Sequence, residues 1–189
     1  MESSNFTTGK VRLSYANIFH PAAAEKPGKK AKYKCMLIIQ KSDSHTVDGI
    51  KKLINAHIEA AKKTNGGKLP NGFKKGLRDG DLEREDDENL KDCYFLNCST
   101  TRAPGIVDKN GFPITDETAV YSGCYVRANI NVYSFNVKED GVNSQGVGFG
   151  LNHIQFWSNG EPLGGGAGVS TADAFATPIE DEEGADDWL

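Results

Sequence analysis

A regular alternation of side chains runs through residues 123–137, which read GCYVRANINVYSFNV. One set of alternate positions is small and apolar: Cys124, Val126, Ala128, Ile130 and Val132. The other set carries rings, amides and a guanidinium: Tyr125, Arg127, Asn129, Asn131, Tyr133 and Phe135. Because successive side chains of a β-strand point to opposite faces, the pattern predicts a long strand with one face in a core.

Shorter strand patterns flank this segment. Residues 10–18 read KVRLSYANI, with Val11, Leu13 and Tyr15 expected to face the core. Residues 31–40 form a second strand, in which Lys32 and Lys34 lie opposite the apolar side chains. Further strands are expected at 93–101 and 147–157, with a hairpin around Asn110-Gly111 and a loop at 19–30.

One amphipathic helix is expected at about residues 44–63. Apolar side chains recur there at three- and four-residue steps, and Asp43 or Ser44 can cap its start. The stretch that follows, about 64–91, is rich in Gly, Pro and Asn and then in charge, and is predicted to be a long mobile loop.

These elements predict a mainly β fold with one domain and two appendages. We expect an antiparallel Greek-key barrel of the oligonucleotide-binding (OB) type at 1–158, with one packed helix. A Gly-rich linker at 159–172 and a disordered acidic tail at 173–189 follow.

Charge is distributed unevenly along the chain, although the net charge is only −4. Residues 1–78 contain 16 Lys or Arg against 5 Asp or Glu, whereas residues 173–189 contain 7 acidic residues and no basic one. A basic body with an acidic appendage creates a field that the net charge conceals, and the basic part is suited to a polyanion.

A cluster of lysines near the start of the chain accompanies two segments that combine rings with cations, and this combination is typical of single-strand binding. Rings stack on bases while Lys and Arg meet phosphates. The alternatives are a solvated surface for the lysines and a second small core beneath the long loop for Tyr133 and Phe135. The candidate binding residues are Arg12, Lys30, Lys32, Lys34, Phe73, Lys74, Lys75, Tyr125, Arg127, Tyr133 and Phe135.

Catalytic and metal-binding signals are weak. The acidic run that begins at Asp79 fails the EF-hand pattern, because Arg84 stands where that loop needs Gly. No histidine adjoins a nucleophile, and the four cysteines are expected to be buried free thiols in a reducing cytoplasm. We therefore expect no catalytic residue, metal or cofactor. No apolar run is long enough for a membrane span, and no signal peptide is expected.

The end of the chain combines carboxylates with a terminal aromatic. An acidic segment after a glycine linker does not fold alone, and a ring at its tip indicates a docking peptide for a basic, apolar pocket. The same carboxylates can compete with DNA for the basic surface. The candidate docking residues are Asp181, Glu182, Glu183, Asp186, Asp187, Trp188 and Leu189.

The chain resembles the single-stranded DNA-binding proteins of tailed bacteriophages. The resemblance rests on KVRLSYANIF, GCYVRANINVYSF, GVGFGLNHIQF and the tail DEEGADDWL. It implies a barrel that coats single strands in replication, recombination or repair, in the host cytoplasm, and a tail that recruits phage enzymes. One departure is that the helix follows the second strand, whereas the usual barrel places it after the third.

Three functions stay open at this point. The first is sequence-independent binding of single-stranded DNA. The second is a metal-dependent nuclease that uses the acidic loop, and the third is an adaptor that binds only protein. A homodimer is compatible with the sequence, which does not set the oligomeric state.

Overall fold

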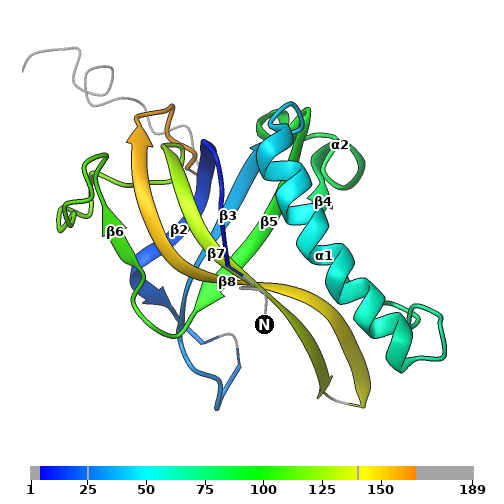
Figure 1. The fold of residues 1–189 in the computed structure, drawn as a ribbon. Helices are drawn as coiled ribbons and strands as arrows, with labels where there is room; N and C mark the ends of the chain where they lie inside the picture. Colours follow the sequence, from blue (N-terminus) through cyan, green and yellow to red (C-terminus); the bar gives the residue numbers. More distant parts are fainter. Residues whose placement is uncertain (1–4, 25, 140, 165–189) are drawn as a thin grey trace, which may run out of the picture.

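Eight strands form one sheet, and five of them close on themselves as a barrel (Figure 1). The computed structural model describes residues 5–24, 26–139 and 141–164. The strands are β1 (Asn5–Thr7), β2 (Val11–Ala22), β3 (Lys32–Gln40), β4 (Arg78–Asp79), β5 (Cys93–Thr100), β6 (Gly105–Val107), β7 (Tyr125–Glu139) and β8 (Val142–Ser158). The helices are α1 (Ser44–Thr64), α2 (Gly80–Glu83) and the 3-10 helix η1 (Glu88–Leu90).

The strand order is that of an OB barrel, which confirms the predicted fold class. Around the barrel the order is β2-β3-β5-β8-β7, and β7 pairs with both β8 and β2. All of these pairs are antiparallel except β5 with β8. The helix α1 lies between the second and third barrel strands, as its position in the sequence indicated.

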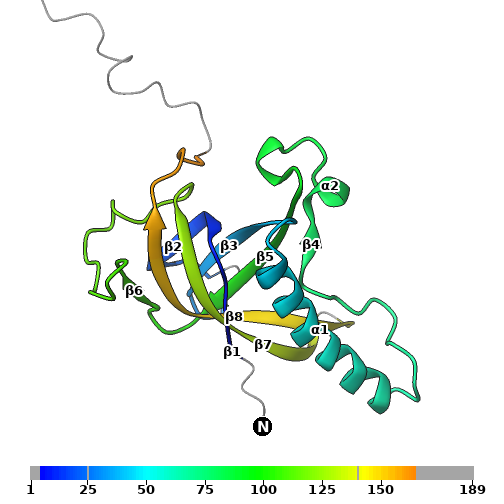
Figure 2. The same ribbon diagram turned by 45° about the horizontal axis from the view of Figure 1, so that its top comes forward.

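The helix α1 begins where the sequence predicted. The Asp43 side chain accepts a hydrogen bond from the Thr46 backbone N–H at 3.1 Å and caps the first turn. Val47, Ile50 and Ile54 are buried on one stripe of the helix. Figures 1 and 2 show α1 running beside the barrel, over the ribbon formed by β7 and β8.

Apolar side chains gather in two cores. The larger fills the barrel and includes the predicted inner face of β7, from Cys124 to Val132. The smaller lies on the outer face of β3 and β5, where Leu163 also packs. The members of this outer core are Met36, Ile38, Leu90, Cys93 and Phe95.

The outer core corrects the prediction for residues 64–91. That segment is not one structureless loop, because its second half contains β4, α2 and η1 and buries Leu90 completely. The alternative role of Tyr133 and Phe135 is a second core, but the outer core consists of Met36, Ile38, Phe95 and their neighbours and does not include those two side chains.

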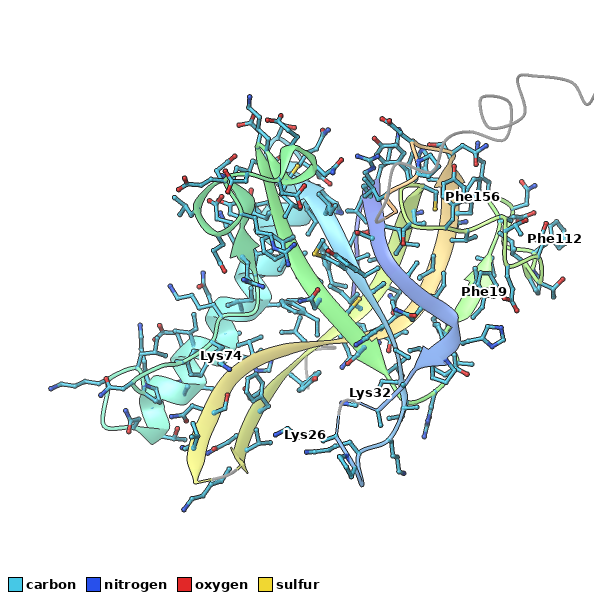
Figure 3. All side chains as sticks on the ribbon, turned by 180° about the vertical axis from the view of Figure 1, so that it is seen from behind. Phe19, Lys26, Lys32, Lys74, Phe112 and Phe156 are labelled. Carbon is cyan, nitrogen blue, oxygen red and sulfur yellow. The ribbon has the colours of Figure 1, made fainter. Side chains whose placement is uncertain are left out.

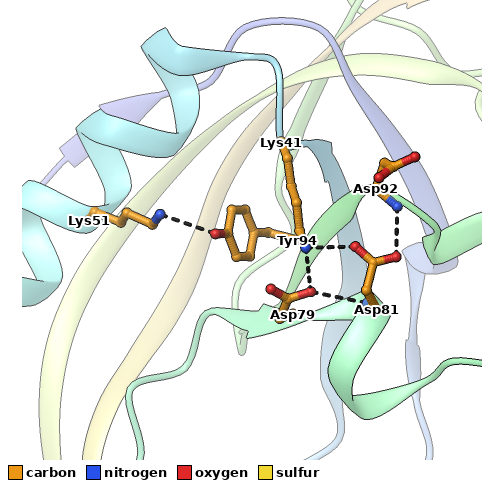
Figure 4. Close-up of polar contacts among 6 residues, drawn as sticks. All are labelled: Lys41, Lys51, Asp79, Asp81, Asp92 and Tyr94. Atoms are coloured by element: carbon orange, nitrogen blue, oxygen red, sulfur yellow. Dashed lines mark hydrogen bonds and ion pairs between the residues drawn. The ribbon is translucent and has the colours of Figure 1, made fainter.

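A polar cluster attaches the same segment to the barrel (Figure 4). The Lys41 ammonium lies 2.7 Å from an Asp79 carboxylate oxygen and 2.6 Å from one of Asp81. It also lies 5.2 Å from the ring centroid of Tyr94, whose hydroxyl accepts from Lys51 at 3.2 Å. The hydrogen bond from Lys41 holds the pKa of Asp81 below its usual value. The first acids of the predicted loop therefore form structural contacts.

The strand β2 departs from its predicted alternation at one residue. Val11 and Leu13 face the core as predicted, but Tyr15 points outward and is 61% exposed. Ser14 pairs with Met36 and Asn17 with Lys34, so two residues of β2 stand opposite the single Cys35. This β-bulge reverses the side of the sheet on which Tyr15 lies, because one extra residue shifts the two-residue period.

Candidate nucleic-acid interface

A basic groove opens on the outer face of β2, β3 and β5 and has a volume of about 640 Å³. Tyr15, Asn17, Asn97 and Ser99 contribute to its lining, and none of the described residues that line it is acidic. Figure 3 shows Lys26 and Lys32 at the end of the β2–β3 hairpin, on the side where β2, β3 and β5 face the viewer. The cations that line this basic groove are Lys26, Lys29, Lys30, Lys32, Lys34 and Arg84.

Strand geometry explains why these cations meet. In β3 the side chains of Cys35, Leu37 and Ile39 enter the core, so Lys32 and Lys34 must face outward. Lys34 pairs with Ser99 of β5, which places the two side chains on the same face of the sheet. The preceding connection adds further lysines above the sheet. A concave surface with one sign of charge concentrates its field on an approaching polyanion.

The outer core limits the basic groove along β3 and β5. Beyond Lys34 the outward positions of β3 are Met36 and Ile38, and both are buried beneath the 78–92 segment and Leu163. Arg84 stands at this boundary, 5.8 Å from the ring centroid of Phe95 in the core and also in the lining of the groove. The basic groove therefore occupies the half of this outer face that lies nearer the β2–β3 hairpin.

The predicted residues on β2 and β7 lie elsewhere. Arg12 donates to the backbone carbonyls of Gly123, at 3.2 Å, and Glu161, at 2.7 Å. The ring of Tyr125 lies beneath the Lys10 ammonium, 4.5 Å from the centroid, and is half-buried. None of these side chains lines the basic groove. In the barrel order β7 adjoins β2 and β8 but not β3 or β5, so Tyr125 is separated from Lys32 and Lys34 by β2.

Arg127 shares the β7 face with Tyr125 and is exposed. Its guanidinium donates to the Thr8 carbonyl at 3.4 Å and to the Gln155 side chain at 3.5 Å. These contacts hold it beside Thr8 and β8, so the aromatic–arginine row predicted on β7 exists but is separate from the lysines of β3.

The remaining predicted residues surround the projecting ribbon of β7 and β8. Tyr133 is 41% exposed and its ring covers Gly148 of the paired strand, where a Cβ atom would clash with it. Lys74 exchanges backbone hydrogen bonds with β8, donating to Gln145 at 3.0 Å and accepting from Val147 at 2.8 Å (Figure 3). Phe73, Lys75 and Phe135 also lie outside the lining of the basic groove, and Phe73 packs against the main core.

Of the eleven candidates, the structure therefore brings Lys30, Lys32 and Lys34 together in one groove. Sequence reasoning missed Tyr15, Arg84 and Asn97. Arg84 was hidden within an acidic run, and Tyr15 was assigned to the core because the alternation gave no sign of the bulge. The predicted docking residues of the tail, 181–189, lie outside the described residues.

Two further searches were confined to the part of the chain that the structure describes. Within it, no group of three or more His, Cys, Asp or Glu side chains is arranged to hold a metal ion. No helix there is long and apolar enough to cross a membrane.

Comparison with known proteins gives a consistent result. A family model described as the ssDNA-binding protein of Enterobacter phage Enc34 matches residues 4–188. A protein designated p50 of Acyrthosiphon pisum secondary endosymbiont phage 1 is 31% identical over 185 residues, covering 92% of this chain and 94% of p50.

Solved structures share the fold at lower identity. The single-stranded DNA-binding protein from bacteriophage Enc34 in complex with ssDNA superposes with a TM-score of 0.68 at 20% identity, covering 86% of this chain and 91% of that one. The gp2.5 single-stranded DNA-binding protein encoded by bacteriophage T7 gives 0.58 at 16% identity, with coverages of 85% and 95%.

Proposed function

This chain belongs to the family of the ssDNA-binding protein of Enterobacter phage Enc34, and on that premise we propose that it binds single-stranded DNA in the basic groove without sequence preference. The observation that carries the proposal is a groove with six cations and no acidic side chain among its described lining residues. By this proposal the protein protects and organises single strands during phage replication, recombination or repair, in the cytoplasm of the host cell.

The chemistry of the groove supports binding that does not depend on sequence. Ammonium and guanidinium groups attract phosphates of any nucleotide, and every base has a face that can stack on a ring. Asn97 and Ser99 supply hydrogen bonds from flexible polar groups. A single strand can follow a curved sheet and turn its bases toward it, whereas a duplex keeps its bases inside.

The acidic tail has two proposed roles. It competes with DNA for the basic groove, and its carboxylates with Trp188 and Leu189 dock onto replication or recombination enzymes of the phage. The linker before the tail supports the first role: Gly164, in that linker, lines a second groove that meets the basic groove at Tyr15. A homodimer stays a prediction, and sedimentation analysis can test it by measuring the oligomeric state.

The alternatives receive less support. The family consists of binding proteins and not of enzymes, so a nuclease is not favoured. Asp79 and Asp81 belong to the acidic segment that a nuclease would use, and both contact Lys41. An adaptor that binds only protein makes no use of the cations in the basic groove.

One experiment separates these functions. The full-length protein is titrated into labelled oligo-dT and into a matched duplex, with and without magnesium. We expect strong retardation of the oligo-dT in a gel, weak retardation of the duplex, and no cleavage. An oligo-dT that runs unretarded at low salt would refute the proposed function, and cleavage that requires magnesium would restore the nuclease.

A further inference from the structure

We propose that Tyr15 ends the path of the bound strand: one base stacks on its ring, and the strand leaves the sheet there. The inference deepens the proposed function and rests on it. It assigns a positioning role to a residue that no comparison names, and it predicts where the DNA stops. Three independent observations support it: the backbone at Tyr15, the position of its ring, and the change in charge on its two sides.

The backbone at Tyr15 has an unfavourable conformation. Its φ is 48°, in the left-handed region that glycine occupies at low cost and other residues avoid. The bulge positions 15 and 16 stand opposite one residue of β3, and glycine is usual at the first position of such a bulge. A tyrosine kept in a strained turn at a surface groove indicates a functional constraint.

Local hydrogen bonds maintain the bulge. The Ala16 backbone N–H donates to the Ser122 hydroxyl at 3.0 Å, and the Asn17 side-chain amide donates to the Tyr15 carbonyl at 3.3 Å. As a result the tyrosine ring stands out from the middle of a barrel strand and is 61% exposed. It is the single aromatic side chain among the described residues that line the basic groove.

Other rings are less suited to this role. Tyr125 is covered by a lysine, and Tyr133 covers a glycine on the projecting ribbon. Neither lines the basic groove. Tyr15 combines an accessible ring face with cations in the same groove, and a base that stacks on it leaves its phosphates near those cations.

The charge changes sign at Tyr15. On its other side lies a second groove of about 480 Å³, which shares Tyr15 and Met36 with the basic groove. The charged residues that line this second groove are Asp87 and Glu161, both acidic. A polyanion that is attracted along one groove is therefore repelled from the next, and Tyr15 marks the boundary.

Two arginines adjoin the second groove without lining it. Arg84 approaches a carboxylate oxygen of Asp87 at 4.0 Å and faces the basic groove. Arg12 donates to Asn89 at 3.3 Å and to the Glu161 backbone carbonyl, so its guanidinium is occupied by protein groups. Arg12 keeps its charge because these acceptors are neutral, but it stands outside the lining, in which the carboxylate of the exposed Glu161 is a charge that a continuing strand would meet.

The first test compares binding of a DNA strand that carries bases with binding of a DNA backbone that lacks them. The full-length protein is titrated into labelled oligo-dT and into a base-free deoxyribose phosphate oligomer of equal length. Tyr15→Ala is expected to lose about 5- to 150-fold in affinity for oligo-dT, the equivalent of one stacked base, and to bind the base-free oligomer as the wild type does. Tyr15→Phe keeps the ring and should bind both as the wild type does.

Two further variants distinguish loss of the Tyr15 ring from a loss of stability and from the loss of a different ring. Tyr15→Gly suits the left-handed backbone, so it is expected to keep or raise thermal stability while losing the same affinity as Tyr15→Ala. Tyr133→Ala is the matched control and should bind both oligomers normally. If Tyr15→Ala and Tyr15→Gly bind oligo-dT as tightly as the wild type, Tyr15 has no positioning role. If the wild type itself fails to bind oligo-dT, the proposed function fails instead.

The second test measures where the strand stops. Affinity is recorded for oligo-dT of increasing length, with one protein per oligomer. In the wild type, affinity stops rising at the length that fills the basic groove. Asp87→Asn with Glu161→Lys removes the repulsion and retains an N-capping side chain for η1, so its affinity should continue to rise with longer oligomers. An unchanged limiting length would overturn the assignment of the boundary.

Discussion

The salt dependence of DNA binding can be worked out from the basic groove. Six cations line it, and each phosphate neutralised on a single strand contributes about −0.7 to the slope of log affinity against log salt. If all six engage phosphates, the slope is about −4, and affinity falls by roughly 300-fold between about 50 mM and 200 mM salt.

Replacing two of these cations changes the slope by a defined amount. Lys30→Ala with Lys32→Ala removes two exposed lysines of the groove and should reduce the slope to about −3, so that the same salt change costs roughly 50-fold. The matched control is Lys52→Ala with Lys63→Ala, which removes two exposed lysines from α1. It changes the net charge equally and should leave the slope near that of the wild type.

Fluorescence anisotropy of a labelled oligo-dT across the salt range gives both slopes, and thermal unfolding confirms that each variant is folded. If the groove variant keeps the wild-type slope, phosphates do not contact this groove. If the α1 control flattens the slope as much, net charge and not the groove sets the salt dependence.

Four other outcomes are expected. Deleting residues 173–189 should raise affinity for oligo-dT, because the deletion removes 7 acidic residues that compete with DNA. Unchanged affinity would show that the tail does not bind in the groove. Asp81→Asn should lower the free energy of unfolding near neutral pH. The hydrogen bond from Lys41 lowers the pKa of Asp81 in the folded protein, so this stabilisation is present above the pKa of the unfolded chain. The difference from wild type in urea titrations should vanish as the pH falls through the lowered pKa. Phe95→Ala should cost about 3–5 kcal/mol of stability in denaturant unfolding, and a loss near zero would contradict the outer core. Iodoacetamide should modify the four buried cysteines only as the protein unfolds, since contact with Cys98 and burial raise the pKa of Cys35; prompt labelling of the native protein would contradict their burial.

Local periodicity made much of the fold predictable. The alternation at 123–137 defined the core face of β7, and the three- and four-residue steps after Asp43 defined α1 with its cap. The outward direction of Lys32 and Lys34 followed from the apolar residues between and beyond them. Each of these features depends on neighbours along the chain, which the sequence displays directly.

The segment at 64–91 could not be predicted from local periodicity. Its composition is polar and rich in glycine, yet Leu90 finds an apolar partner in Phe95 and Asp81 finds a cation in Lys41. Those partners lie on β5 and at the end of β3. The order of this segment depends on contacts with residues that are distant in the sequence, and its own composition does not reveal them.

What the sequence by itself determined is the five long strands and the main helix, the barrel class they form and the presence of outward-facing cations and rings. Only the tertiary structure decided which of these side chains share a surface: strand order separated Lys34 from Tyr125 by the whole of β2, and one extra residue in β2 moved Tyr15 out of the core into the groove. The physical reason is that alternation fixes the side of a strand on which a residue lies, whereas pairing order and register between distant strands fix its neighbours.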